Sequence, residues 1–414
     1  MLKQRELRTI VVVGSSLAGL RACETLRQEG FAGEIALIGA EAEIPYDRPP
    51  LSKKVLAGEW DADRIRLRKP DDFAGLALDL RLGSAAVALD VAARVVTLAD
   101  GSKLPFDGLV IATGATPRRL PGQPDLDGVV ELRTLANSIA LRDRIADGAA
   151  RVTVIGAGFI GLEVAATARQ RGCVVTVLEG APAPLMRGLG AEMGSAVAAV
   201  HTRHNVDLRC GVSVAGIEGD GTRVTGVRLT AGNLIATDVV VVGVGVAPAT
   251  QWLADSGIQL GDGVICDATL QTSAPGIYAA GDCARWPNGV FTGFDDEVMR
   301  IEHWTNAAEQ GAAAARNMLA IARGEPATPY QSVPFFWSDQ FDSRIQFVGR
   351  AHGGDDIHVF AGDLSGDFAA LYGFAGRLRG VLGVNMPRLV MPFRALIAEH
   401  ATWSEALEKA EQRA

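Results

Sequence analysis

Two segments of the chain each combine a short apolar run, a turn of glycine and other small residues, and an alanine-rich stretch. Residues 9–19 have the sequence TIVVVGSSLAG, and residues 151–161 have the sequence RVTVIGAGFIG. An apolar run followed by such a turn and a helix lets backbone N–H groups and the helix N-terminus bind a pyrophosphate. One turn of this kind is weak evidence, but two in one chain predict an α/β protein with two Rossmann-like dinucleotide-binding domains.

Length and charge limit the possible classes of protein. A chain of 414 residues is too long for a single core, and two or three domains are expected. Its net charge of −8 argues against a nucleic-acid binder, which would need a basic face. The N-terminus lacks the apolar stretch of a signal peptide, and no apolar run approaches membrane-spanning length. We therefore expect a cytoplasmic protein.

The cysteines are too far apart for redox pairs. They show no CxxC or CxxxxC spacing, so free thiols in a reducing compartment are expected. A flavin disulfide reductase needs two cysteines a few residues apart beside the flavin, and this chain lacks such a pair. No His/Cys grouping has metal-ligand spacing either, so no metal is predicted. The five cysteines are Cys23, Cys173, Cys210, Cys266 and Cys283.

The order of predicted elements places the second glycine turn in an insertion. We predict a discontinuous first dinucleotide-binding domain, residues 1–114 and 247–325, with a second one, residues 115–246, inserted in it. A smaller α+β domain, residues 326–414, completes the chain. The predicted elements are helices at 17–29, 305–322 and 392–401 and strands at 34–39, 80–89, 94–98, 108–115, 174–179, 224–230, 238–245, 344–349 and 368–373.

The second turn carries the complete pattern of a nicotinamide nucleotide site. Glu179 ends the next predicted strand, 23 positions after Gly156, where an acidic residue bonds ribose hydroxyls. A carboxylate there repels a 2′-phosphate, which favours NADH over NADPH. A solvated glutamate at a strand end is the alternative. The predicted NAD-binding residues of this turn are Gly156, Gly158, Phe159, Ile160 and Gly161.

The first turn is less regular. Ser16 replaces the middle glycine, and Ala40 stands where an acid is expected, so Glu41 is assigned the ribose role. Asp282 supports a nucleotide here, because the sequence Ala-Ala-Gly-Asp places its carboxylate at the tip of a strand. In flavoproteins with two such domains this aspartate bonds the ribitol chain. The predicted FAD-binding residues are Gly14, Ser15, Ser16, Leu17, Ala18, Gly19, Glu41, Gly281 and Asp282.

Taken together, these motifs resemble the oxygenase-coupled NADH:ferredoxin reductases, relatives of putidaredoxin reductase, rubredoxin reductase and apoptosis-inducing factor. The resemblance covers nearly the whole chain. Its most specific part is residues 45–53, PYDRPPLSK. Further matching segments are 112–114, 155–163, 243–248, 279–283 and 336–340.

By this resemblance, Lys53 and Glu163 are the catalytic pair. Lys53 would lie near the reactive edge of the flavin, and Glu163 would form a charge pair with it. Phe335 and Trp337 would serve electron transfer or docking, although many relatives carry tryptophan at the position of Phe335. The resemblance also implies FAD contacts from Arg48, Lys53, Ala86, Ala112, Thr113, Gly114, Arg133 and Trp304, and NAD contacts from Glu163, Arg187 and Gly245.

The implied activity is transfer of a hydride from NADH to FAD, followed by release of single electrons to a small iron–sulfur protein. That partner would be a ferredoxin of the [2Fe–2S] type feeding an oxygenase or cytochrome P450, and the enzyme a monomer or weak homodimer. Because ferredoxins are usually acidic, docking would need a basic patch. Its candidates are residues 64–69, Arg377, Arg379, Arg388 and Arg394.

Two other functions remain open at the level of sequence. An NADH oxidase or peroxidase shares the architecture but uses a cysteine near the flavin, and residues 41–58 contain none. A signalling flavoprotein like apoptosis-inducing factor would use NADH to shift its conformation, but the chain has no targeting segment or basic surface to support that function.

Overall fold

The computed structural model of the chain describes residues 7–294 and 297–413. Residues 1–6, on which part of the expectation about targeting rests, lie outside the described residues. Two compact units are present. The first comprises Met1–Asp47, Arg66–Thr116 and Ala247–Pro334, and the second comprises Arg48–Ile65, Pro117–Val246 and Phe335–Ala414.

A parallel five-stranded sheet forms the centre of the first unit. Its order is β20 (Ile277–Ala279), β7 (Gly108–Ile111), β1 (Thr9–Val13), β2 (Glu34–Ile38) and β3 (Leu78–Arg81). Strand β1 pairs with β2 on one side and β7 on the other, so the direction of winding reverses at β1. The valines of β1 are buried, as expected for a parallel strand covered on both faces.

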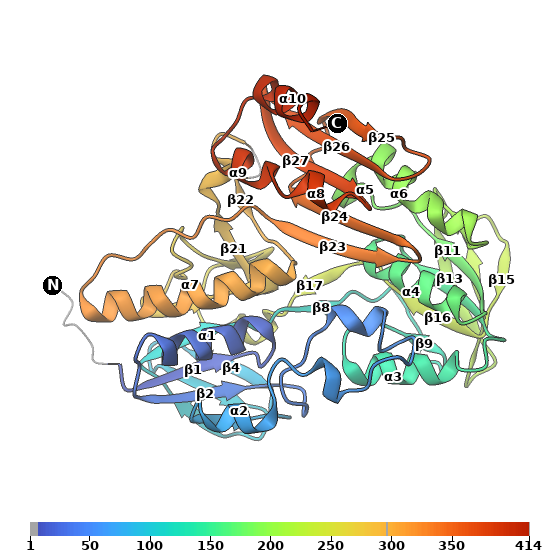
Figure 1. Cartoon of the computed structure of the whole chain (residues 1–414). Coiled ribbons are helices and arrows are strands. Elements are labelled where there is room, and N and C mark those ends of the chain that lie inside the picture. The colour runs from blue at the N-terminus through green and yellow to red at the C-terminus, as the bar shows by residue number, and fades with distance from the viewer. Residues whose placement is uncertain (1–6, 295–296, 414) are drawn as a thin grey trace. The chain divides into compact units, whose positions relative to one another are not determined.

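Two helices of the first unit, α1 (Leu17–Gln28) and α7 (Trp304–Arg323), pack against each other (Figure 1). A Cβ on Gly311 of α7 would lie 2.1 Å from the carbonyl oxygen of Ala18 in α1, so glycine is what permits this close approach. The remaining elements of the unit are α2 (Pro70–Ala74), β4 (Ala86–Asp90), β5 (Val95–Leu98), β6 (Lys103–Pro105), β18 (Leu260–Gly261), β19 (Gly263–Ile265), β21 (Ala284–Pro287) and β22 (Val298–Met299).

The second unit contains another parallel five-stranded sheet. Its order is β12 (Asp207–Arg209), β11 (Val174–Leu178), β10 (Arg151–Ile155), β16 (Val239–Val242) and β9 (Val129–Val130). Strand β10 lies between β11 and β16, which repeats the reversal seen at β1. The other elements are α3 (Leu135–Arg144), α4 (Phe159–Gln170), α5 (Met186–Leu189), α6 (Ala191–Arg203), β13 (Val214–Gly219), β14 (Val224–Leu229) and β15 (Leu234–Ala236).

An antiparallel sheet from the end of the chain completes the second unit. The hydroxyl of Tyr372 in this sheet donates a hydrogen bond to the carbonyl oxygen of Leu189 at 2.9 Å, and the buried side chains of both sheets form one core. The strand order is β23 (Phe335–Gln340), β24 (Ser343–Gly349), β27 (Arg377–Val384), β26 (Phe368–Phe374) and β25 (Asp356–Gly362), followed in the chain by α8 (Pro387–Val390), α9 (Phe393–Ala398) and α10 (Trp403–Glu411).

Four predicted elements are wrong in extent. The predicted strands 108–115 and 238–245 end earlier, at Ile111 in β7 and at Val242 in β16. The predicted strand 80–89 is two strands, β3 and β4, because Gly83 turns the chain with a φ of +70°. The predicted final helix 392–401 ends earlier, since His400 adopts a φ of +61°, and Thr402 then caps a further helix, α10. The three domain boundaries stay a prediction.

Candidate functional site

Two glycines shape the turn after β1. Gly14 has a φ of +119°, and a Cβ there would lie 2.0 Å from the carbonyl oxygen of Ala112. A Cβ on Gly19 would lie 1.9 Å from the carbonyl oxygen of Gly14. Ser16 is the N-cap residue of α1, and its side chain makes no capping hydrogen bond. The turn therefore exposes backbone and a helix N-terminus at the point where the sheet reverses its winding.

The loop after β2 holds Glu41 in place. The hydroxyl of Tyr46 donates a hydrogen bond to the Glu41 carboxylate, which is half-buried. Nearby in sequence, Asp47 accepts a hydrogen bond from the indole Nε1 of Trp304 at 2.7 Å. Tyr46 and Asp47 both belong to the motif at 45–53, although neither was predicted as a site residue.

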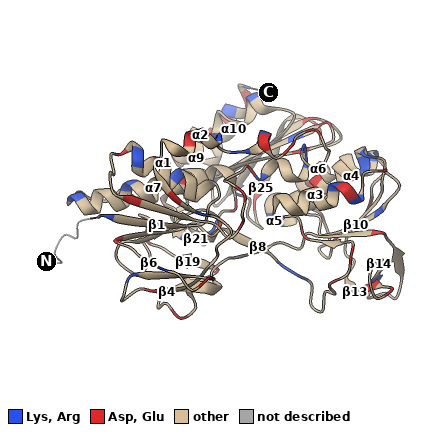
Figure 2. Ribbon diagram, turned by 90° about the horizontal axis from the view of Figure 1, so that it is seen from below, with Lys and Arg blue, Asp and Glu red and all other residues tan. Residues whose placement is uncertain are grey.

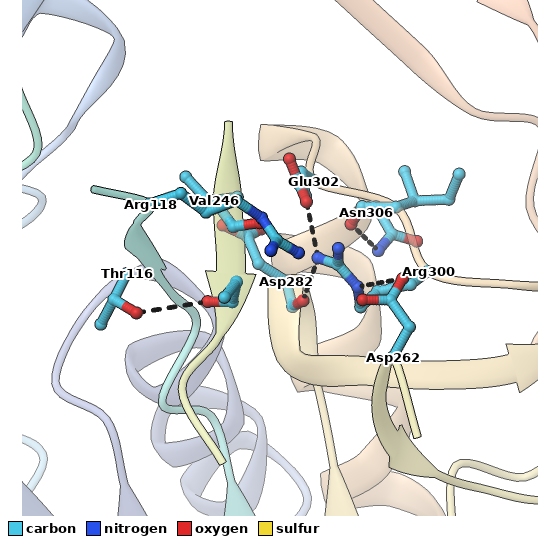
Figure 3. Close-up of polar contacts among 10 residues, drawn as sticks. Thr116, Arg118, Val246, Asp262, Asp282, Arg300, Glu302 and Asn306 are labelled. Atoms are coloured by element: carbon cyan, nitrogen blue, oxygen red, sulfur yellow. Dashed lines mark hydrogen bonds and ion pairs between the residues drawn. The ribbon is translucent and has the colours of Figure 1, made fainter. Parts of the chain in front are cut away.

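Asp282 is anchored through its backbone. The Arg300 Nη1 donates to the carbonyl oxygen of Asp282 at 3.0 Å and to Glu302 at 2.6 Å, while its Nε donates to Asp262 at 3.1 Å (Figure 3). The Arg300 side chain is only 9% exposed. The two carboxylates therefore hold the guanidinium in one orientation, and the guanidinium fixes the strand tip that carries Asp282.

Gln310 supports the residue before Asp282. Its Oε1 accepts a hydrogen bond from the N–H of Gly281 at 2.8 Å, and its buried Nε2 has no partner. Of the other predicted FAD residues in this unit, Thr113 donates to the carbonyl oxygen of Ala249 at 2.7 Å, and Ala86 begins β4. Arg300 and Gln310 were not predicted, because nothing in their local sequence marks them.

The turn after β10 follows the same geometry with one difference. Gly156 has a φ of +108°, and a Cβ there would lie 2.3 Å from the carbonyl oxygen of Gly243. A Cβ on Gly158 would meet no atom within 4 Å. The first glycine is thus required by the fold itself, whereas the second leaves open space above the N-terminus of α4.

Other predicted NAD residues gather around this turn. The Arg187 guanidinium lies 3.5 Å from where a Cβ on Gly245 would stand, so these two predicted residues are neighbours. Ile160 is 49% exposed beside the turn. Phe159 instead packs inward, edge-on to Phe336, with ring centroids 4.7 Å apart.

Lys53 and Glu163 form the predicted ion pair, with Nζ and Oε2 2.9 Å apart. The Glu163 side chain is 7% exposed and also accepts hydrogen bonds from the hydroxyls of Ser52, at 2.5 Å, and Ser338, at 2.6 Å. A buried carboxylate is stable only when paired and hydrogen-bonded, and here three donors supply that stabilisation. The carboxylate therefore holds the Lys53 ammonium in a fixed position.

Arg48 lies in the same unit as this pair. Its Nη1 donates a hydrogen bond to the carbonyl oxygen of Arg133 at 2.7 Å, which brings together two predicted FAD residues separated by 85 positions in the chain.

The residues present fit two dinucleotides. At the second turn, Gly158 leaves open space next to a helix N-terminus, which is the kind of position where a pyrophosphate binds. At the first, the unpartnered amide of Gln310 is a buried donor beside the Gly281–Asp282 tip. In residues 7–294 and 297–413 no group of three or more His, Cys, Asp or Glu side chains could hold a metal.

Comparison with known proteins shows the family. The model of the pyridine nucleotide-disulphide oxidoreductases matches residues 8–311, and that of the reductase C-terminal domain matches residues 335–412. The chain belongs to the pyridine nucleotide-disulphide oxidoreductase family. Within this family, the predicted resemblance and fold class are confirmed: two dinucleotide-binding domains, one inserted in the other, and a C-terminal domain.

Several similar proteins are named as reductases of rhodocoxin, ferredoxin or putidaredoxin. The chain is 38% identical to rhodocoxin reductase of Rhodococcus erythropolis over 94% of its length and 89% of that protein. It is 36% identical to the ferredoxin–NAD(+) reductase component of the p-cumate 2,3-dioxygenase system of Pseudomonas putida, over 92% and 91%. The covalent putidaredoxin reductase–putidaredoxin complex contains a chain with a TM-score of 0.90, 33% identity and 99% coverage of both chains.

This member of the pyridine nucleotide-disulphide oxidoreductase family has no disulfide among its described residues. All five cysteines are free, and four are buried. Cys283, next to Asp282, is fully buried, and burial raises the pKa of its thiol. A neutral thiol is a poor nucleophile, which disfavours the peroxidase alternative.

The predicted docking residues lie on β23. The rings of Phe335 and Trp337 stack with centroids 6.1 Å apart, and both side chains are half-buried. No described helix of this family member is long and apolar enough to cross a membrane.

The predicted basic patch is wrong at Arg379, which is a fully buried residue of β27 with its guanidinium over the ring of Phe374. Arg68 is engaged by the buried carboxylate of Glu24 at 2.5 Å. Basic and acidic residues are interspersed along the ribbon (Figure 2). The predicted basic patch therefore loses Arg379, and the charge of Arg68 within it is balanced by Glu24.

Proposed function

We propose that the chain is an FAD-dependent NADH:ferredoxin reductase. The observation that carries this proposal is the presence of two glycine turns, each at the reversal point of its own parallel sheet, in a chain that matches a ferredoxin reductase over 92% of its length. Two nucleotide sites and no cysteine pair favour an enzyme that passes electrons out to a separate protein.

The first unit supplies most of the proposed FAD contacts. The turn at Gly14 to Gly19 would bind the pyrophosphate, Glu41 the ribose, and Asp282 the ribitol hydroxyls. Bound FAD would supply the chemistry that joins a two-electron donor to a one-electron acceptor. The remaining proposed contacts are Arg48, Ala86, Ala112, Thr113, Gly114, Arg133, Gly281 and Trp304.

The second turn binds NADH in this proposal. Gly156, Gly158 and Gly161 with the N-terminus of α4 would hold the pyrophosphate, and Glu179 the adenosine ribose. The guanidinium of Arg187, next to Gly245, supplies a positive charge for the nucleotide.

Lys53 is the residue proposed to act on the flavin electronically. Its ammonium would stabilise the negative charge that develops on reduction, and Glu163 keeps the ammonium in place. In this mechanism no side chain needs to act as a nucleophile.

The proposed acceptor is a ferredoxin, taken to be of the [2Fe–2S] type, that feeds an oxygenase or cytochrome P450. The names of the relatives support this, since one is a component of a dioxygenase system and another is linked to putidaredoxin. Phe335 and Trp337 are the proposed docking residues. We place the protein in the cytoplasm as a monomer or weak homodimer.

Anaerobic stopped-flow kinetics test the function. NADH should bleach the flavin absorbance of the purified protein, and a second mixing step with a [2Fe–2S] ferredoxin should restore it faster than mixing with rubredoxin or oxygen. Colourless protein that takes up no FAD, or NADH absorbance that stays constant with every acceptor, would refute the proposal.

A further inference from the structure

A line of buried polar side chains runs from α6 to Glu163. Ser338 Oγ donates to Glu163 at 2.6 Å, and Gln340 Nε2 donates to Ser338 Oγ at 3.1 Å. Gln340 Oε1 in turn lies 2.8 Å from His201 Nε2. Ser338, Gln340 and His201 are all completely buried. Together with Lys53, these side chains form one continuous chain of hydrogen bonds within the second unit.

The charge on Glu163 sets the direction of every bond in this chain. An ionised carboxylate only accepts, so the single proton of the Ser338 hydroxyl must point at Glu163. The Ser338 oxygen is then an acceptor, which requires Gln340 to present its amide N–H₂ to it. The carbonyl oxygen of Gln340 consequently faces His201, and His201 Nε2 must carry a proton.

The surroundings of His201 agree with this direction. If Nε2 carries the proton of a neutral ring, Nδ1 is a bare acceptor, and Nδ1 is buried with no partner. The ring meets Phe341 edge-on at 5.2 Å, and burial lowers the pKa of the imidazole to about 4. His201 is therefore a neutral donor at pH 7 and closes the chain at its far end.

We propose that Ser338, Gln340 and His201 are positioning residues that act on Lys53 through Glu163. They fix the carboxylate so that it holds the ammonium in the orientation needed for flavin reduction. This inference rests on the proposed role of Lys53. It gives the reductase C-terminal domain a part in the redox step, in addition to docking.

The pleat of β23 separates the two tasks. Side chains alternate between faces along a strand, so Ser338 and Gln340 share one face, while Phe335 and Trp337 share the other. Their burial agrees, since Ser338 and Gln340 are buried and the two aromatic residues are half-buried. One strand thus carries the proposed docking residues on one side and the proposed positioning residues on the other.

A double-mutant cycle in the FAD-loaded protein tests the inference. Ser338→Ala should slow anaerobic flavin reduction at saturating NADH about tenfold, the effect of one lost charge-assisted hydrogen bond. The flavin midpoint potential should fall by about 30 mV, which corresponds to a tenfold change in the equilibrium constant for two-electron reduction. Ser338→Thr keeps the hydroxyl and should restore both values. Thr237→Val, which removes another buried hydroxyl of this unit, should change neither.

The Lys53→Met background separates the possible outcomes. If Ser338→Ala adds nothing to Lys53→Met, the two residues act in one chain and the inference holds. If Ser338→Ala lowers the reduction rate by the same factor in both backgrounds, Ser338 does not act through Lys53 and the inference is overturned. The proposed role of Lys53 is then unaffected. If Lys53→Met alters neither rate nor potential, the proposed role of Lys53 fails, and the inference fails with it.

A spectroscopic measurement is independent of turnover. The ¹⁵N NMR shifts of the His201 ring in the oxidised protein should show a neutral imidazole protonated at Nε2. In Gln340→Leu, that Nε2 resonance should shift. A ring protonated at Nδ1 in the unmodified protein would contradict the deduced direction and overturn the inference, whatever the kinetics.

Discussion

The carboxylate of Glu179 accepts a hydrogen bond from the backbone N–H of Ala157 at 2.7 Å and another from the N–H of Ala181 at 2.8 Å. Ala157 lies inside the second glycine turn, 22 residues before Glu179. The carboxylate is thus held against the turn, and in the proposed site we expect its negative charge to disfavour a 2′-phosphate.

Replacing Glu179 should weaken the preference for NADH. Glu179→Ala removes a charged partner for the ribose, so we expect the KM for NADH to rise about tenfold or more and the NADH/NADPH discrimination to shrink. Steady-state kinetics with ferricyanide as acceptor measure both. Glu192→Ala, on the exposed start of α6, is the control and should leave both values unchanged. Undiminished discrimination in Glu179→Ala would remove this residue from the site.

The two glycines of the second turn should respond differently to alanine. Gly156→Ala forces a Cβ against the Gly243 carbonyl at a positive φ and should cost roughly 3 kcal/mol of unfolding free energy. Gly158 has open space and a φ of −79°, so Gly158→Ala should keep the stability and raise the KM for NADH. Urea unfolding together with NADH kinetics distinguishes the two effects. Equal stability losses would contradict the structure.

Arg300 should matter for retention of FAD. Arg300→Met leaves the Asp282 carbonyl without its donor and leaves Asp262 and Glu302 without the cation that both contact. We expect the Kd of the apoprotein for FAD to rise about tenfold, measured by quenching of flavin fluorescence. Arg316→Met breaks only an exposed ion pair with Glu29 and should leave the Kd unchanged. An unchanged Kd in Arg300→Met would show that the strand tip needs no such anchor.

His201 should make stability depend on pH. Burial lowers the pKa of its imidazole to about 4, whereas histidine in an unfolded chain titrates near pH 6.5. Between these two pH values the unfolded chain binds more protons than the folded chain. The contribution of His201 to the free energy of unfolding is therefore fully present above about pH 6.5 and is lost as the pH is lowered towards about 4.

The expected loss across that window is roughly 3 kcal/mol, measured by urea unfolding at several pH values. His201→Gln should remove most of the slope, while His358→Gln, at an exposed position, should retain it. The same slope in His201→Gln would mean that other groups govern the pH dependence.

The local sequence was sufficient to predict the two glycine turns. Positions such as Gly14 and Gly156 can be recognised in the chain because a strand, a tight turn and a helix N-terminus are built from consecutive residues. The pairing of Lys53 with Glu163 is a different case. The two residues are far apart in the chain, and only the family resemblance predicted that they meet.

Neither the local sequence pattern nor the family resemblance predicted which side chains hold Glu163 and Asp282 in place. Ser338 and Gln340 lie in a segment that the sequence marks, but their bonds to Glu163 and His201 arise only when β23 is set beside α4 and α6. The anchor of Asp282 on Arg300 likewise depends on strands brought together by the sheet. The sequence by itself determined the two turns and the resemblance to the family. The tertiary structure alone decided which buried donors satisfy the buried charges, because desolvated polar groups must find partners across the core, at distances along the chain that no local pattern encodes.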